Sequence, residues 1–426
     1  MLTVLVVVLL VCFVFNIPIG FALGVASIGS LLAGGNPDQL IMVPQRIVAS
    51  MNSFPLLAIP LFMVAGSVME IGGVSKRIVT AASSLIGHIR GGLASVSIMA
   101  CTFFAAISGS TPATAAAIGS LTIPEMRQRG YPDDYSSAVV AASSCLGVVI
   151  PPSITMVVFG VTGNISIGKM LIGGVIPGLL IASMLIATNV YFSRKADFPT
   201  EPKESRKQRL TALKEAFWAL MMPVIILAGI MSGVFTPTES AAVAVVYGLI
   251  VSLFIYKEMS LKDLVPVFYK AALNSAMIML LIGTAGPFGW IMTVQDVPNM
   301  VSTAILSISD NYYVIFSLVL LIYLILGTFM ETAAIIMLTV PILTPIMVNI
   351  GADMVHYGVV SVIALAIGMA TPPVGIALFA TCGVSKVTMA QISKQIWPFL
   401  LVMILALFVL MLVPQIVTFL PNLMMG

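Results

Sequence analysis

Two adjacent prolines occur twice inside long apolar stretches of this sequence. Pro151–Pro152 lies within "LGVVIPPSITMVVF", and Pro372–Pro373 lies within "IGMATPPVGIALF". Proline has no backbone N–H and its ring clashes with the preceding turn, so a pair of prolines interrupts a helix. In hydrocarbon, the freed backbone groups are tolerated only where protein buries them or where they line a wet cavity. Freed carbonyl oxygens can bind a hard cation, and the two half-helix ends direct partial charges into the break.

Two polar stretches could supply further ligands. "SGSTPAT" at 108–114 offers hydroxyl groups around a glycine, and "GTFMET" at 327–332 offers two threonines and Glu331. Oxygen ligands without histidine or thiolate favour Na⁺ over a transition metal. We therefore expect each stretch to meet one proline break in an oxygen-rich pocket at mid-membrane. Glu331 could contact a ligand, orient its stretch or pair with a helix N-terminus. Glu239, which follows "TPT", is expected to cap a helix at the outer surface.

The composition identifies the environment of these stretches. Of 426 residues, 60% are hydrophobic and only 8% are charged, so the chain cannot cover itself with a polar surface. We therefore expect a polytopic membrane protein embedded in a lipid bilayer. The two histidines and four isolated cysteines offer neither a metal centre nor a nucleophile–base pair, and the sequence has no phosphate-binding glycine loop. We expect no enzyme activity and no nucleic-acid partner.

The chain consists of two related halves. A charged, proline-containing linker at 194–214 separates 1–193 from 215–426. Four motifs recur in the same order about 220 residues later, which indicates an internal duplication. The paired motifs are "VFNIPIGFALG" with "VFTPTESAAVA", "MNSFPLLAIPLF" with "LNSAMIMLLIGT", "SGSTPATAA" with "LGTFMETAA", and the two proline pairs.

Hydropathy predicts an odd number of membrane crossings in each half, so the second repeat must be inverted relative to the first. The expected crossings are 1–15, 18–34, 54–72, 133–163 and 168–193, then 216–235, 237–256, 274–294, 355–384 and 395–420. Stretches 91–126 and 311–350 have polar midpoints, and we interpret them as re-entrant helical hairpins. Stretches 37–52 and 260–275 suit arm helices in the membrane surface, although an ordinary loop explains the first equally well.

The fold class follows from this map. It is an all-α polytopic fold of two inverted-topology repeats with re-entrant hairpins and broken helices. Scaffold helices are expected in 1–72 and 215–294. Hairpins with broken helices are expected in 91–163 and 311–384.

The basic residues orient the chain in the membrane. With the N-terminus outside, every lysine and arginine except Arg46 and Lys169 falls on the inner side, including those of the linker. The expected outer loops contain Asp296, Asp310 and Asp353 without lysine or arginine. The positive-inside rule therefore supports an inverted second repeat.

Six motifs are spread along the sequence: "FPLLAIPLFMVAG", "SGSTPATAAAIGSLTIPEM", "GVVIPPS", "GVFTPTESAA", "GTFMETAA" and "GMATPPVG". Together they make the chain resemble the large membrane subunit, the M-type permease, of tripartite ATP-independent periplasmic (TRAP) transporters. The resemblance extends over essentially the whole chain.

The resemblance implies a multi-pass protein of the bacterial inner membrane with an elevator-type fold of the ion-transporter superfamily. Its N-terminus would be periplasmic and its central linker cytoplasmic. It would import an organic acid, such as a C4-dicarboxylate, sialic acid or a related carboxylate, driven by a Na⁺ gradient. Two partners are implied: a small four-helix Q-type membrane subunit on another polypeptide, and a periplasmic substrate-binding protein.

The resemblance also implies individual site residues at matching positions. The first cation site would use Ser108 and Ser110 with the backbone at Gly147, Val149 and Pro151. The second would use Gly327, Thr328, Gly368 and Thr371. The substrate carboxylate would lie between the tips, near Ser110, Thr111, Thr328 and Thr332.

A channel remains the alternative to a transporter, because channels also use broken helices and carbonyl oxygens. An inverted repeat with two hairpins favours the transporter, since one fold then supplies an inward and an outward state. Saturable Na⁺-coupled uptake against a gradient would separate the two.

Overall fold

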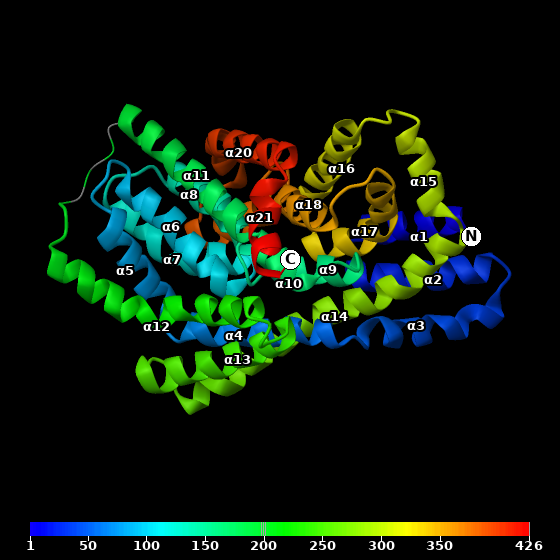
Figure 1. The fold of residues 1–426 in the computed structure, drawn as a ribbon, viewed down its shortest axis with the longest axis horizontal. Helices are drawn as coiled ribbons and strands as arrows, with labels where there is room; N and C mark the ends of the chain where they lie inside the picture. The colour runs from blue at the N-terminus through cyan, green and yellow to red at the C-terminus, as the bar shows by residue number, and fades with distance from the viewer. Residues whose placement is uncertain (197, 199, 201, 426) are drawn as a thin grey trace.

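The computed structural model describes the chain except residues 197, 199, 201 and 426, and the described residues form helices without a β-strand (Figure 1). The first half contains α1 Leu2–Val14, α2 Ile19–Ala33, α3 Met42–Met51, α4 Ala58–Ile71, α5 Val74–Ile86, α6 Gly92–Ser108, α7 Thr111–Gln128, α8 Asp133–Ser144, α9 Ile154–Thr162, α10 Ile167–Gly173 and α11 Val175–Lys195. Short 3-10 helices occur at Pro37–Ile41, Phe54–Leu57 and Cys145–Val148.

The second half repeats this order of elements. It contains α12 Arg206–Met231, α13 Pro237–Ile250, α14 Leu264–Val294, α15 Val297–Leu306, α16 Tyr312–Gly327, α17 Thr332–Asn349, α18 Met354–Met369, α19 Ile376–Ser385, α20 Met389–Leu412 and α21 Gln415–Met425. A π-helix at Val251–Ile255 extends α13, and a 3-10 helix at Leu261–Asp263 precedes α14. The expected all-α membrane fold is confirmed.

The helices form two groups with different neighbours. Along the lower edge of Figure 1, α4 and α12 pack against α13, and α14 packs against α2, α3 and α4. The hairpins and broken helices lie above this layer. Helices α5 and α15 contact both groups, since α5 packs on α12 and α6, and α15 packs on α14 and α17. We call the lower group the scaffold and the upper group the hairpin domain.

Both helical hairpins and both proline breaks are present as expected. Helices α6 and α7 form the first hairpin and α16 and α17 the second. The chain is unwound between α8 and α9 and again between α18 and α19, at the two proline pairs. The repeats interlock reciprocally, because α7 packs against α19 and α9 packs against α17. Each hairpin therefore contacts the broken helix of the other repeat as well as its own.

The second arm differs from its expectation. The separate segments 260–275 and 274–294 are wrong, because Leu264–Val294 is one helix of 31 residues. In the first repeat the arm α3 does end, at Met51, and Pro55 follows in the next 3-10 helix. A proline biases the residue before it away from the helical conformation, and "NSAMIM" in the second repeat has no such residue.

Several other boundaries also differ. Helix α12 begins at Arg206, inside the expected linker, where Ser205 and Gln208 form a capping box. The expected crossing 395–420 is divided between α20 and α21 at Pro414. Seven helices in the described part of the chain are long and apolar enough to cross a membrane. One of them is α17 of the second hairpin, so length alone does not distinguish a crossing helix from a hairpin arm.

Candidate functional site

The turn of the first hairpin brings three oxygen atoms together. Ser108 Oγ lies 2.7 Å from Thr114 Oγ1, and the Thr114 hydroxyl donates a 2.8 Å hydrogen bond to the Ser110 carbonyl. Ser108 Oγ is 3.4 Å from the same carbonyl oxygen. Hydroxyl and carbonyl oxygens are ligands that suit a hard cation. The turn is therefore an oxygen cluster at the junction of α6 and α7.

The unwound segment of the first broken helix lies directly against this turn. A Cβ atom at Gly147 would lie 2.6 Å from the Ser110 carbonyl oxygen and 2.8 Å from Thr114 Oγ1. Gly109 has φ +60°, and a Cβ there would lie 2.9 Å from the Pro152 carbonyl oxygen. Only glycine adopts this left-handed conformation without strain and leaves room for the approach. Within the described part of the chain, the carbonyls of 149–152 accept no hydrogen bond.

The second hairpin meets its broken helix through glycine backbones. A Cβ atom at Gly368 would lie 2.7 Å from the Gly327 Cα atom, and a Cβ at Gly327 would lie 3.0 Å from the Gly368 Cα atom. The Gly375 N–H donates a 2.9 Å hydrogen bond to the Thr328 carbonyl. The Thr328 and Thr371 hydroxyls each donate to a carbonyl in their own helix, at 2.7 and 2.8 Å. Their lone pairs are left for another partner.

Glu331 caps the second arm of this hairpin. Its Oε2 atom accepts hydrogen bonds from the N–H groups of Ala333, at 2.8 Å, and Ala334, at 3.3 Å. The Thr332 hydroxyl donates to Oε1 at 3.1 Å. Of the three roles left open for Glu331, pairing with a helix N-terminus is confirmed, and the charge also favours the positive end of the helix. The expected cap at Glu239 is likewise confirmed, by a capping box with Thr236.

A cavity of about 530 Å³ lies beside the first turn. One wall is a face of α4 and one a face of α14, since the residues from each helix recur at three- and four-residue intervals. The opposite wall is the first hairpin, the start of α9 and the carboxylate of Glu331. The lining residues are Met63, Gly66, Ser67, Glu70, Phe104, Ser108, Ser110, Pro112, Ala113, Ala116, Ile154, Lys270, Asn274, Met277, Ile278, Leu281 and Glu331. The cavity therefore lies at the boundary between the scaffold and the hairpin domain.

Comparison with known families decides the class of protein. The family model described as "Tripartite ATP-independent periplasmic transporter, DctM component" matches residues 6–416. The chain belongs to the DctM family. It is therefore the large permease of a TRAP transporter, a transport protein of a bacterial membrane and not an enzyme.

Curated relatives agree along the full length of this permease. It is 38% identical to the C4-dicarboxylate TRAP transporter large permease protein DctM of Vibrio cholerae, over 97% of this chain and 96% of that protein. It is 37% identical to the sialic acid TRAP transporter large permease protein SiaM of the same organism, over 96% of each chain. It is 43% identical to the isethionate TRAP transporter permease protein DctMQ of Oleidesulfovibrio alaskensis, over 95% of this chain but 64% of that protein.

A solved structure shares the fold of the permease. The structure is titled "Crystal structure of the Alcanivorax borkumensis YdaH transporter reveals an unusual topology". It matches with a TM-score of 0.57 and 13% identity, over 88% of each chain. At this identity the likeness concerns the fold alone.

The structure brings together some residues that the sequence of this permease singles out. Ser108, Ser110 and Gly147 meet at the first turn, whereas the Val149 carbonyl oxygen lies against Gly174 at the start of α11. Among the described residues, Pro151 forms no hydrogen bond with the turn. At the second turn, Gly327 and Gly368 touch, and Thr328 is bonded to Gly375 near Thr371.

The four expected substrate residues are spread out. Ser110 lines the cavity, but Thr111, Thr328 and Thr332 do not line it. The Thr111 side chain is fully buried and its hydroxyl has no hydrogen-bond partner in the described part of the chain. Thr332 Oγ1 instead lies 3.3 Å from Thr155 Oγ1 of α9.

Two residues near the turns were not singled out from the sequence. Thr114 completes the first oxygen cluster, and the internal repeat holds the signal for it, because "SGSTPATAA" and "LGTFMETAA" align Thr114 with Thr332. Thr155 joins α9 to the second turn, and no pattern in the sequence marks it. Residues far apart in the chain become neighbours only through tertiary packing.

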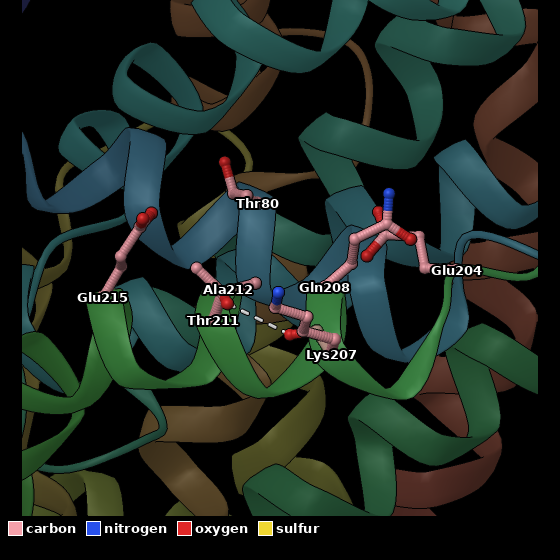
Figure 2. A pocket seen from close by; sticks show the side chains of 7 residues that line it. All are labelled: Thr80, Glu204, Lys207, Gln208, Thr211, Ala212 and Glu215. Carbon is pink, nitrogen blue, oxygen red and sulfur yellow. Dashed lines mark hydrogen bonds between the residues drawn. The ribbon is translucent and has the colours of Figure 1, made fainter.

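A second cavity has a different character. A surface cavity of about 350 Å³ lies between Thr80 of α5 and the first half of α12, and Figure 2 shows the side chains that line it. Its other lining residues are Glu204, Lys207, Gln208, Thr211, Ala212 and Glu215. None of the residues expected at the cation or substrate sites is among them.

Proposed function

We propose that this permease imports an organic acid by Na⁺-coupled alternating access. The observation that carries the proposal is the pair of turns, each packed on an unwound helix, beside a cavity at the boundary between the scaffold and the hairpin domain. The repetition of this arrangement in both repeats supports a transport mechanism, since inverted repeats provide two related conformations of one fold.

Na⁺ is the coupling ion that the available ligands fit best. The first turn offers the Ser108 and Thr114 hydroxyls and the Ser110 carbonyl, and the second offers Thr328, Thr371 and unwound backbone. The described residues contain no cluster of three or more histidine, cysteine or acidic side chains suited to a metal ion. Oxygen ligands of this kind select hard cations over transition metals.

The substrate class is an organic anion of modest size. Relatives are named as permeases for C4-dicarboxylates, sialic acid and isethionate, which are a dicarboxylate, a sugar acid and a sulfonate. The cavity of about 530 Å³ can hold a molecule of this size, and Lys270 at its edge provides a positive charge. These observations favour an acid with one or two anionic groups.

The movement that we propose is an elevator movement of the hairpin domain along the scaffold. The cavity lies between these two groups, so a sliding displacement would carry the turns and their ligands together while the scaffold stays in place. Helices α5 and α15 contact both groups and are the connections that would bend. Motion of one repeat group against another is the usual form of alternating access.

We also propose the orientation and the partners implied by the family. The Arg127 guanidinium donates to the Ser385 carbonyl at 3.2 Å, and the Gln395 amide donates to Asp134 at 3.1 Å. These contacts place the basic loops of both repeats on one side of the molecule, which supports a cytoplasmic position for them. A small four-helix subunit and a periplasmic binding protein complete the transporter. The relative named DctMQ extends well beyond the part that this chain matches, which leaves room for the small subunit.

Reconstituted uptake tests the proposal. Liposomes containing the permease and its small subunit, with the binding protein outside, should accumulate labelled succinate, isethionate or N-acetylneuraminate under an inward Na⁺ gradient. Uptake should saturate and should stop when K⁺ replaces Na⁺. The permease alone should transport poorly. Accumulation without Na⁺ would contradict Na⁺ as the coupling ion. Full uptake by the permease alone would contradict the need for the two partners. Flux that never raises the internal concentration above equilibrium would favour a channel.

A further inference from the structure

One charged pair at the cavity is not explained by the cation sites. Lys270 Nζ lies 3.2 Å from Glu70 Oε2, and both side chains line the cavity. Lys270 is the one cationic residue among the lining residues of the described chain. Glu70 comes from α4 and Lys270 from α14, so the pair joins two scaffold helices. It does not involve the hairpin domain.

The position of the pair along α14 is informative. The α14 residues that line the cavity run from Lys270 to Leu281 on one helix face, and eleven residues of helix rise by about 16 Å. Asn274 follows Lys270 by one turn, whereas Met277, Ile278 and Leu281 make the far part of this wall apolar. Lys270 therefore lies at one end of the cavity. In the proposed topology this is the cytoplasmic end.

The pair is accessible enough to exchange partners. The Lys270 side chain is 54% exposed and the Glu70 side chain 31% exposed. Water screens a pair of this kind, so its mutual attraction is weak and a dissolved anion can compete for the lysine. A carboxylate or sulfonate entering this part of the cavity would meet one cation, Lys270. That cation is already paired with the carboxylate of Glu70, which carries a negative charge as the substrate does.

We propose that Lys270 binds the anionic group of the substrate at the cytoplasmic end of its path, and that Glu70 competes with the substrate for Lys270. In the empty cavity Glu70 pairs with Lys270. The substrate replaces Glu70 as it leaves the hairpin turns, and Glu70 then displaces the substrate into the cytoplasm. Lys270 is thus a substrate-contacting residue of the inward-facing state. This inference depends on the proposed function, because it takes the cavity to be the route of an organic acid.

The competition makes the two partners act in opposite directions. Lys270→Gln removes the attraction, so the equilibrium dissociation constant of the acid should rise about tenfold. Glu70→Gln removes the competitor and leaves the lysine free, so the dissociation constant should fall severalfold. If the pair only joins α4 to α14, either substitution removes the same contact, and both variants should shift binding in the same direction or not at all.

The experiment measures binding of one labelled acid to the purified complex of permease and small subunit in Na⁺. The acid is whichever of succinate, isethionate and N-acetylneuraminate the parent takes up into liposomes. Lys270→Arg should preserve parental binding, because it keeps the charge. Lys262→Gln serves as the matched control, because Lys262 is an exposed lysine eight residues away that does not line the cavity. The concentration of loaded binding protein that gives half-maximal uptake should change little in every variant, because Lys270 acts at the cytoplasmic end of the cavity.

The outcomes separate this inference from the proposed function. A parent complex that neither binds nor takes up any of the three acids would overturn both. A functional parent with opposite shifts in Lys270→Gln and Glu70→Gln supports the exchange. A functional parent whose two variants shift together, or whose Lys262→Gln control shifts as far as Lys270→Gln, overturns the role of Lys270 and leaves the transport function in place.

Discussion

Alanine at Gly368 should separate the second hairpin from its broken helix. The added Cβ would lie 2.7 Å from the Gly327 Cα atom and 2.7 Å from the Leu324 carbonyl oxygen. Ordinary van der Waals contact begins at 3.4 Å, so the two backbones must move apart by about 0.7 Å. Both neighbours are backbone atoms and cannot rotate away, so overpacking of this kind should destabilise by about 1–3 kcal/mol.

A matched variant controls for the general effect of replacing glycine. Gly383 lies in α19, and a Cβ there would meet nothing within 4 Å. Gly383→Ala should therefore stabilise the helix by about 1 kcal/mol through propensity alone. Gly327→Ala is an intermediate case, because its nearest contact is 3.0 Å. The structure thus predicts an order of stability from Gly383→Ala through Gly327→Ala to Gly368→Ala.

Thermal melts of the purified permease in NaCl and in KCl are the assay. A ligand that binds only the folded state raises its apparent stability, so the parent should melt at a higher temperature in Na⁺. Gly368→Ala should melt several °C below the parent and lose much of the Na⁺-dependent shift, because the second hairpin no longer packs closely against its broken helix. If Gly368→Ala and Gly383→Ala have the same melting temperature and the same Na⁺ shift, the close approach of Gly327 and Gly368 does not form a cation site.

Three further predictions follow from the same arrangement. Ser108→Ala or Thr328→Ala should raise the Na⁺ concentration needed for half-maximal uptake while leaving folding largely intact; an unchanged Na⁺ dependence in both would exclude these side chains as ligands. Pro372→Ala with Pro373→Ala should restore helical hydrogen bonds, since each proline in a helix interior costs about 3 kcal/mol, and should give a protein at least as stable as the parent but without Na⁺-dependent stabilisation. A less stable double variant that keeps its full Na⁺ shift would mean that the prolines only bend the helix. Thr114→Val should keep the shape of the first turn but remove one oxygen, and it should raise the Na⁺ requirement as Ser108→Ala does; normal Na⁺ dependence would show that Thr114 serves packing alone.

The turns and breaks could be predicted because their residues are unsuited to an uninterrupted membrane helix. A proline pair cannot continue a helix, and the glycine–hydroxyl stretches have no reason to lie in hydrocarbon unless protein or ligand satisfies them. The duplication then placed each turn with a break, and the contacts of Gly147 with Ser110 and of Gly368 with Gly327 confirm that pairing.

The cavity could not be predicted in this way. Its walls on α4 and α14 are regular helix faces that carry ordinary residues such as Met63 and Ile278. Only packing shows that these faces oppose the first hairpin. The Glu70–Lys270 pair joins residues 200 positions apart, and neither motif nor spacing connects them. The continuity of α14 could not be predicted for a related reason. A surface arm and a crossing helix differ in hydropathy, so the sequence suggests two segments, but the helical backbone can continue from one into the other without a break.

The central claim is that the hairpin domain moves along a fixed scaffold, and cysteine accessibility tests it most directly. Ala113 of α7 and Ser67 of α4 face the same cavity from opposite walls. Each is replaced singly by cysteine in a variant whose four native cysteines are removed, and membrane-impermeant maleimide is added from one side at a time. Ala113→Cys should react from the cytoplasmic side in the absence of substrate and from the periplasmic side when Na⁺, binding protein and substrate drive turnover, whereas Ser67→Cys should react from the cytoplasmic side alone. Reaction of Ala113→Cys from only one side under every condition, in a complex that still transports, would contradict the elevator movement.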